Sequence, residues 1–246
     1  MVVRYVPLGA TDELGCRALT DAAETLDGPL VIGAWMTRAW VLGTGMAQAL
    51  RATNDVDIAA PPDGGSDAAA ALLLQRGYQQ DQLGYPFRYV RLTDAGLHII
   101  DLMVDEQRSS SSEAAFPVYG LDEAAKTTTR MTLELVGVGT ADIRVPALDG
   151  AFLLRSLALA DGAGGLKFED YARDAWSVGR LLINDEDALA AWRARSGEFV
   201  ERARTIASPL FSSSTGPGPL AVARRSAGDQ DLVARQVSET MTELLR

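Results

Sequence analysis

The stretch Arg51-Ala-Thr-Asn-Asp55-Val-Asp57-Ile58 decides the fold that we expect for this chain. Its apolar and polar residues alternate, which is typical of a β-strand. Residues i and i+2 of a strand project to the same face, so the carboxylates of Asp55 and Asp57 should point together. Two like charges this close repel each other unless a cation lies between them. Because carboxylate oxygens favour Mg²⁺, the pair predicts a metal-binding strand; a surface turn is the alternative reading of Asp-x-Asp alone.

A glycine ends the apolar run Pro29-Leu-Val-Ile-Gly33, and a helix-compatible segment continues from Ala34. This pattern predicts a strand-to-helix turn at which the backbone can approach a ligand closely. A helix that begins there would direct its unpaired N–H groups toward an anion. Gly43-Thr44 is a second candidate for the turn, but it resembles a break within a helical region. Gly33 is therefore the preferred assignment.

A third acid lies in a later strand. Two runs of strong β-formers, residues 87–91 and 97–104, flank Thr93-Asp94-Ala-Gly96 and predict a hairpin. Asp101 is an isolated acid inside the second run. Burying a carboxylate without a partner is costly, so we expect Asp101 to face the same metal as the Asp-x-Asp pair. For His98, on the same run, packing or a hydrogen bond is the expected role.

The order of these motifs resembles that of polymerase-beta-type nucleotidyltransferases: a glycine at a strand end, then Asp-x-Asp, then an Asp on a later strand. The stretches Val31-Ile-Gly33-Ala-Trp-Met and Arg51-Ala-Thr53-Asn-Asp55-Val-Asp57 are similar to the minimal bacterial branch. That branch includes the AbiE-like (AbiEii/MenT-type) nucleotidyltransferase toxins of abortive-infection toxin–antitoxin systems. The resemblance extends over about residues 29–182. Arg155 stands where such proteins usually carry a lysine, and Ser177 stands where a second helical acid is expected.

The resemblance implies an α+β fold. An N-terminal mixed sheet with flanking helices (residues 1–147) would form the nucleotidyltransferase core, and a helical domain (148–246) would complete the cleft. Asp55, Asp57 and Asp101 would be catalytic and would hold one or two Mg²⁺ ions. The nucleotide would be bound by residues of both parts, namely Gly33, Ala34, Arg51, Thr53, Arg155, Lys167 and Asp174. Lys167 and Asp174 fall on one face of a predicted helix, which lines the cleft or is simply solvated.

The implied activity is transfer of a nucleoside monophosphate from an NTP to a hydroxyl group. A tRNA, a protein or a small molecule would be the acceptor, and a toxin of this kind would have a cognate antitoxin protein. Two alternatives remain open. One is a degenerate family member that binds a nucleotide or a partner without turnover, which Arg155 and Ser177 favour. The other is a metal- or ligand-binding structural protein whose motif order is coincidental.

The amino-acid composition excludes several classes of protein and of binding site. The chain has 246 residues, 47% of them hydrophobic, enough for one large or two small domains. A single cysteine and a single histidine exclude an internal disulfide and metal sites rich in these residues. The net charge of −10 argues against broad nucleic-acid binding. No apolar run approaches the roughly 20 residues of a membrane span and no signal peptide is visible, so a cytoplasmic location is expected.

The remaining elements follow from periodicity and turn residues. We expect Thr11 to cap a helix over residues 11–27, and residues 212–219 to form an exposed linker. The predicted strands cover residues 29–33, 54–60, 87–91, 97–104, 128–138 and 141–145. The other predicted helices cover residues 34–50, 67–76, 148–160, 167–183, 185–207 and 230–245.

Overall fold

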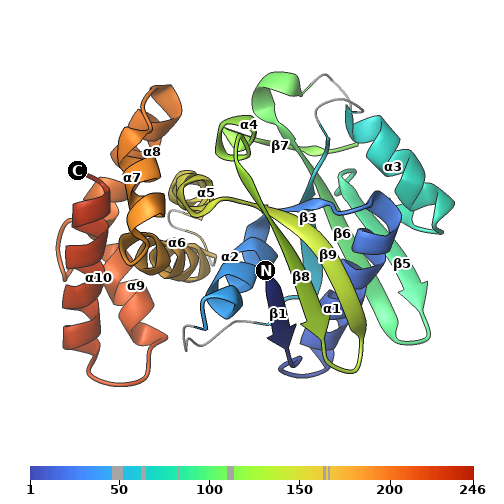
Figure 1. The fold of residues 1–246 in the computed structure, drawn as a ribbon, viewed down its shortest axis with the longest axis horizontal. Coiled ribbons are helices and arrows are strands. Elements are labelled where there is room, and N and C mark those ends of the chain that lie inside the picture. Colours follow the sequence, from blue (N-terminus) through green and yellow to red (C-terminus); the bar gives the residue numbers. More distant parts are fainter. Residues whose placement is uncertain (46–51, 62–64, 83, 110–113, 163–164, 166) are drawn as a thin grey trace. The chain divides into compact units, whose positions relative to one another are not determined.

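The computed structural model describes residues 1–45, 52–61, 65–82, 84–109, 114–162, 165 and 167–246 (Figure 1). Its internal contacts divide the chain into two compact units, Met1–Pro146 and Ala147–Arg246. The first unit contains the strands and the second is helical. The boundary between the predicted domains, 1–147 and 148–246, lies one residue after the boundary between these units.

The first unit is a mixed sheet with helices packed on it (Figure 1). In the described residues the strand order is β1-β8-β9-β2-β3-β6-β5-β4, and β7 pairs with β6. The strands are β1 (Val2–Tyr5), β2 (Leu30–Val31), β3 (Asp55–Ala59), β4 (Gln79–Gln80), β5 (Arg88–Thr93), β6 (Gly96–Asp105), β7 (Phe116–Val118), β8 (Thr128–Leu135) and β9 (Gly139–Pro146). The helices are α1 (Ala10–Leu26), α2 (Gly33–Gly43), α3 (Gly65–Gln75), α4 (Leu121–Ala124) and the short 3₁₀ helix η1 (Glu106–Arg108).

Both kinds of strand pairing meet at the centre of this sheet. Strand β3 is antiparallel to β2 and parallel to β6, and β6 is antiparallel to β5. The prediction of an α+β fold with a mixed sheet is confirmed. The hairpin predicted around Thr93 and Gly96 is β5–β6, and these two residues face each other at its closed end.

Helix α1 packs against β3, β6 and β9 through a buried stripe that includes Cys16, Leu19 and Ala22. Gly15 lets the helix come close to the start of β3, because a Cβ there would lie 2.0 Å from the carbonyl oxygen of Thr53. The predicted N-cap was wrong: the helix begins at Ala10, with Gly9 at the N-cap position. Just before it, the N–H of Leu8 donates to the Asp12 carboxylate at 2.8 Å.

Helix α2 contacts β1, β3 and β9. The indole Nε1 of Trp40 on this helix donates to the carbonyl oxygen of Pro146 at 3.0 Å. The helix was predicted over residues 34–50. It ends at Gly43, and residues 46–51 lie outside the described part of the chain.

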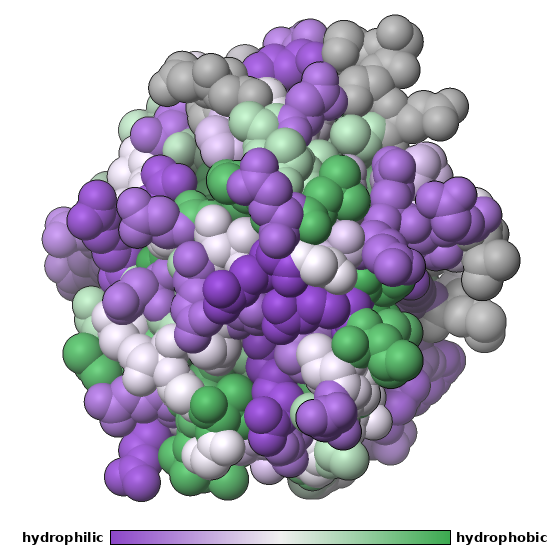
Figure 2. All heavy atoms as spheres, turned by 90° about the vertical axis from the view of Figure 1, so that its right-hand side faces the viewer, coloured by the Kyte–Doolittle hydropathy of each residue, from purple (hydrophilic) through white to green (hydrophobic). Residues whose placement is uncertain are grey.

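The outward side of α3 and β5 mixes hydrophilic areas with small, separate hydrophobic ones (Figure 2). Exposed apolar residues on these elements include Leu72, Leu74 and Leu92. Scattered apolar side chains of this kind are normal on a protein surface and call for no partner.

The second unit is built from helices that bury Phe152, Trp192 and Phe211 among them. The rings of Phe152 and Trp192 meet edge to face at 4.9 Å, and the indole Nε1 of Trp192 donates to the Leu244 carbonyl at 2.7 Å. The helices are α5 (Leu148–Gly162), α6 (Phe168–Ile183), α7 (Glu186–Ala194), α8 (Glu198–Phe211), α9 (Pro217–Arg224) and α10 (Gln230–Leu244). None of the helices in the described ranges is long and apolar enough to cross a membrane.

Two expectations for this unit were wrong. The single helix over residues 185–207 is two helices, α7 and α8, separated at Gly197, whose φ of 102° is incompatible with a continuous α-helix. The linker over residues 212–219 contains the start of α9. Pro217 is its first residue, a position where the missing proline N–H leaves no helical hydrogen bond unmade.

Candidate active site

The three predicted acids lie on one face of two neighbouring strands. Strands β3 and β6 are parallel, and their register places Asp57 opposite Asp101 and Asp55 opposite Ile99. Paired residues on adjacent strands project to the same side of a sheet, and so do residues two apart on one strand. The carboxylates of Asp55, Asp57 and Asp101 therefore share one face, and that they hold a metal together stays a prediction.

Arg88 on β5 binds the third acid from the other side of β6. It lies opposite Asp101 in the antiparallel register of β5 and β6. Its Nε is 2.8 Å from Asp101 Oδ1 and its Nη2 is 2.7 Å from Oδ2, which makes a bidentate ion pair. Asp101 is 4% exposed, so the pair holds a carboxylate that is almost fully buried. The hydrogen bond to Asp101 raises the pKa of Arg88, against the opposing effect of burial.

The same guanidinium also reaches Asp55. Its Nη2 lies 3.8 Å from Asp55 Oδ2 and 2.7 Å from Asp101 Oδ2. The distance between these two carboxylate oxygens therefore cannot exceed the sum of the two values. That separation is within the limit of about 6–7 Å for carboxylates that share a metal. The hydroxyl of Thr53 donates to Asp55 Oδ1 at 2.5 Å. The structure thus places Thr53, which was predicted to bind the nucleotide, as a hydrogen-bond donor to Asp55.

Gly33 lies against the second acid. It is the first residue of α2, with φ of 61°, and a Cβ there would be 1.7 Å from Asp57 Oδ2. The predicted strand-to-helix turn is present, and the group that it approaches closely is the Asp57 carboxylate. A negative charge is stabilised beside a helix N-terminus. The alternative, Gly43, lies at the other end of α2, where a Cβ would meet the sulfur of Met1.

The remaining predicted nucleotide ligands divide between the two units. Ala34 follows Gly33 in the first turn of α2, and Arg51 lies outside the described residues. In the helical unit, Arg155 on α5 and Asp174 on α6 are both buried, with Arg155 Nη2 3.5 Å from Asp174 Oδ2. Lys167 is exposed at the N-cap position of α6. That Lys167 and Asp174 face the acid-bearing sheet stays a prediction.

The site fits a divalent cation in its chemistry but not in its present arrangement. Three carboxylates supply the hard oxygen donors that Mg²⁺ prefers, and the absence of a side chain at Gly33 lets the Asp57 carboxylate lie directly against the start of α2. However, both oxygens of Asp101 accept hydrogen bonds from Arg88. Within the described ranges, no group of three or more histidine, cysteine, aspartate or glutamate residues is arranged to hold a metal ion.

Arg88 is the site residue that the sequence analysis missed. A signal for it was present in the hairpin. Thr93 and Gly96 form the last pair before the turn. Arg88 lies five residues before Thr93 and Asp101 lies five residues after Gly96, so the two are also paired across the hairpin. The cross-strand partner of an isolated acid can therefore be read from the predicted turn.

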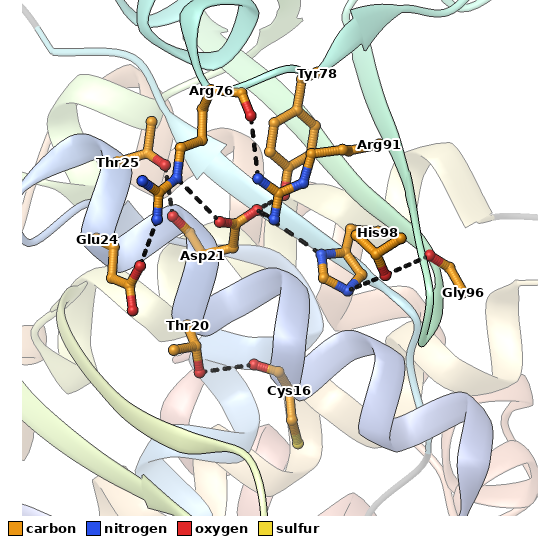
Figure 3. Close-up of polar contacts among 11 residues, drawn as sticks. Cys16, Thr20, Asp21, Glu24, Thr25, Arg76, Tyr78, Arg91, Gly96 and His98 are labelled. Carbon is orange, nitrogen blue, oxygen red and sulfur yellow. Dashed lines mark hydrogen bonds and ion pairs between the residues drawn. The ribbon is translucent and has the colours of Figure 1, made fainter.

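Figure 3 shows a second acid–arginine cluster, which includes Arg91 of β5 and His98 of β6. These residues lie on the opposite face from Arg88 and Asp101, because each is three residues away along its strand. Asp21 of α1 accepts a hydrogen bond from the Tyr78 hydroxyl at 2.5 Å, and its Oδ2 lies 2.6 Å from Arg91 Nη2. Arg76 Nε approaches Asp21 Oδ1 at 3.5 Å. Burial, followed by the hydrogen bond to Asp21, raises the pKa of Tyr78. This cluster joins α1 to the segment after α3 and to both strands.

His98 belongs to this second cluster and not to the acid site. Its Nδ1 lies 3.8 Å from Asp21 Oδ2, and its Nε2 lies 3.4 Å from the Thr93 hydroxyl. Burial lowers the pKa of His98 more than the charge of Asp21 raises it. Burial therefore favours the neutral form of the ring, and its surroundings match the packing or hydrogen-bonding role expected for it.

The chain matches no protein-family model and no curated protein. Among solved structures it is similar to an antigenic nucleotidyltransferase-like protein from Paracoccidioides brasiliensis, with 18% identity and a TM-score of 0.45 over 74% of this chain and 86% of that one. It is also similar to the antibiotic-resistance factor ANT(2'')-Ia, with 14% identity and a TM-score of 0.38 over 74% of this chain and 95% of that one. Likenesses at this level say nothing of chemistry, so the site rests on its own geometry.

Proposed function

We propose that this protein is a nucleotidyltransferase of the polymerase-beta type, which transfers a nucleoside monophosphate from an NTP to a hydroxyl group. The observation that carries the proposal is the shared face of Asp55, Asp57 and Asp101 on β3 and β6. Gly33 supports it, because the start of α2 lies directly against the Asp-x-Asp strand. This combination of acids and a helix N-terminus suits a substrate with phosphates and their counter-cations.

In this proposal, Asp55, Asp57 and Asp101 would hold Mg²⁺. The bound ion would supply charge stabilisation for an in-line displacement at phosphorus. The acceptor oxygen forms a bond to the α-phosphorus, the bond from that phosphorus to the bridging oxygen breaks, and pyrophosphate leaves. Asp101 is the proposed acceptor of the hydroxyl proton. Thr53 fixes the rotation of the Asp55 carboxylate, and the first turn of α2 provides N–H groups for the phosphates.

The helical unit would add the remaining contacts to the nucleotide. Lys167, exposed at the start of α6, is proposed to bind triphosphate oxygens, with Arg155 and Asp174 nearby. The proposed acceptors are a tRNA, a protein or a small molecule. A toxin role with a cognate antitoxin, as in the AbiE-like branch, and a cytoplasmic location belong to the same proposal.

The proposal is tested by measuring the transfer of label from an NTP to an acceptor. The protein is incubated with each α-labelled NTP and Mg²⁺, first with total cellular RNA, then alone, then with a panel of small hydroxyl compounds. We expect label on one acceptor class from one preferred NTP, and none with Asp57→Asn under the same conditions. Transfer by the Asp57→Asn protein at the wild-type rate would contradict the assignment of the site. Absence of transfer to all three classes would contradict the proposed activity.

A second candidate function is nucleotide or partner binding without turnover. It is favoured by two ion pairs that engage three of the proposed site residues: Asp101 pairs with Arg88, and Arg155 pairs with Asp174. The two functions differ in their products. A binding protein would retain NTP, measured by equilibrium dialysis, and return it unchanged, whereas the enzyme would release pyrophosphate.

A further inference from the structure

We propose that Arg88 is the internal counter-ion of Asp101 in the cation-free protein, and that a divalent cation at the acid site has to displace it. The cation site itself rests on the proposed function. The role of Arg88 goes beyond that function, because Arg88 would neutralise Asp101 within the protein when no cation is bound.

The first argument is the geometry of the pair. Arg88 uses Nε and Nη2 for the two oxygens of Asp101, at 2.8 and 2.7 Å. Each carboxylate oxygen has two lone pairs, and Arg88 uses one on each oxygen of Asp101. A divalent cation on the remaining lone pairs would lie close to the positive charge of the guanidinium, which opposes its binding. The third acid is therefore engaged by Arg88 for as long as the pair persists.

The balance of charge at the acid site also favours the exchange of Arg88 for a cation. Asp55, Asp57 and Asp101 carry three negative charges on one face, and Arg88 brings one positive charge to two of them. Asp101 is nearly fully buried, and a buried carboxylate requires compensation. Loss of Arg88 alone would remove the two charged hydrogen bonds that this buried carboxylate accepts from it. Exchange of Arg88 for a cation of higher charge keeps the carboxylate compensated and neutralises more of Asp55 and Asp57.

The third argument is that the guanidinium has a second partner nearby. Its Cζ lies 5.3 Å from the centre of the Tyr85 ring, within the range of a cation–π contact. Tyr85 is 53% exposed and the Arg88 side chain is 27% exposed, so this side of the pair faces solvent. Arg88 can therefore leave Asp101 while it keeps the contact with Tyr85. It would remain beside the acids as a cation for phosphate oxygens.

The experiment measures cation affinity in the nucleotide-free protein, with Mn²⁺ as the probe and electron paramagnetic resonance or calorimetry as the readout. We expect Arg88→Met to bind Mn²⁺ about tenfold or more tightly than the wild type, because it removes the competitor for Asp101. The control is Arg4→Met, on the exposed edge of β1, which changes the net charge equally and should leave the affinity unaltered. An affinity of Arg88→Met that is equal to or below that of the wild type would overturn the proposal.

Thermal unfolding gives a second readout. Without a divalent cation, Arg88→Met should unfold at a lower temperature than the wild type, and Mn²⁺ should restore it. Mn²⁺ should raise the unfolding temperature of the wild type much less. If Arg88→Met does not fold, Arg88→Lys replaces it, since lysine keeps the charge but cannot form the bidentate pair. An Arg88→Lys protein with wild-type affinity for Mn²⁺ would also refute the displacement.

This inference and the proposed function can fail separately. Tighter Mn²⁺ binding by Arg88→Met, in a protein whose wild type transfers no nucleotide, contradicts only the activity. Nucleotide transfer by the wild type, together with unchanged Mn²⁺ affinity in Arg88→Met, contradicts only the role of Arg88.

Discussion

An arginine of β5 binds an acid on each face of the β5–β6 hairpin, Arg91 with Asp21 of α1 on one face and Arg88 with Asp101 of β6 on the other, and the two clusters differ in their balance of charge. On one face Asp21 is surrounded by donors, with Tyr78 and Arg91 in close contact and Arg76 slightly further away (Figure 3). On the other face Arg88 lies between Asp101 and Asp55, and Asp57 adds a third carboxylate.

Both clusters are built from aspartate and arginine, and they differ in the number of hydrogen-bond donors for each carboxylate. The Asp21 carboxylate is satisfied within the protein, so its cluster should act as a joint between α1 and the sheet. Among the described residues, the acid face brings three carboxylates to one guanidinium, so we expect it to bind a cation from outside. Each of the following predictions changes one face and leaves the other as a reference.

The largest effect is expected on activity at the acid face. Asp57→Ala should reduce nucleotide transfer by about 10³-fold or more, because it removes a proposed cation ligand. The unfolding temperature without a divalent cation should stay equal or rise, because the variant relieves repulsion between carboxylates. The measurements are labelled-NTP transfer and thermal unfolding. Full activity would refute the role of Asp57, and a marked loss of stability would refute the charge imbalance.

The opposite pattern is expected for Asp21→Ala. This variant leaves Arg91 and Tyr78 without their carboxylate, and it should lower the free energy of unfolding by about 3–5 kcal/mol. Transfer activity per folded molecule should change little. Urea unfolding measures the stability, and Tyr78→Phe, which removes one hydrogen bond, should cost only about 1 kcal/mol. Equal losses in the two variants would show that Asp21 does not hold the cluster together.

Gly33 and Gly45 form a matched pair for testing the close approach of α2 to Asp57. Their φ angles are 61° and 67°, but a Cβ at Gly33 would strike Asp57 whereas one at Gly45 would meet nothing within 4 Å. Gly45→Ala should show the backbone strain alone, about 1 kcal/mol. Gly33→Ala should cost about 1–3 kcal/mol more and reduce transfer. Similar losses of stability in the two variants, measured by urea unfolding, would argue against the contact with Asp57.

The smallest effect concerns pH and the Asp21 face. Burial holds the pKa of His98 below its ordinary value in the folded state, so the unfolded chain takes up this proton first as pH falls. The stability that the neutral ring contributes is present above about pH 6.5 and declines below it, toward the folded pKa. His98→Gln should therefore lose less stability than the wild type between pH 7.5 and 5.5. Identical losses in urea unfolding would contradict this.

Much of the fold and the acid face could be predicted from local patterns. Asp55 and Asp57 share a face because strands repeat every two residues, and the turn before β6 is marked by Thr93 and Gly96. The break between α7 and α8 was not predicted because the apolar spacing continues through it, and Gly197 alone marks the end of the helix. Periodicity reports which face is buried, but it does not report where the backbone turns.

The interactions of the site were less predictable than its acids. Thr53 was assigned to the nucleotide, but its hydroxyl bonds to Asp55, two residues away. Arg155 was compared with a lysine of the resembled family, and it lies beside Asp174 within the helical unit. The Thr53 hydrogen bond is local, but residue type alone does not show whether the hydroxyl binds a neighbouring acid or a ligand. The Arg155–Asp174 pair depends on how α5 and α6 pack together, which residue spacing does not encode. Arg88 is the exception, since the hairpin register relates it to Asp101.

The register between β3, β6 and β5 also has a consequence for folding. A shift of β6 by one residue would exchange its two faces, and Asp101 would then project toward α1 and Asp21. Two carboxylates would share the buried space that now holds one, and Arg88 would lose its partner on the other face. Misaligned pairings of this strand are therefore penalised on both sides at once. The charges that prepare the site for a cation would also direct the nascent sheet toward a single alignment.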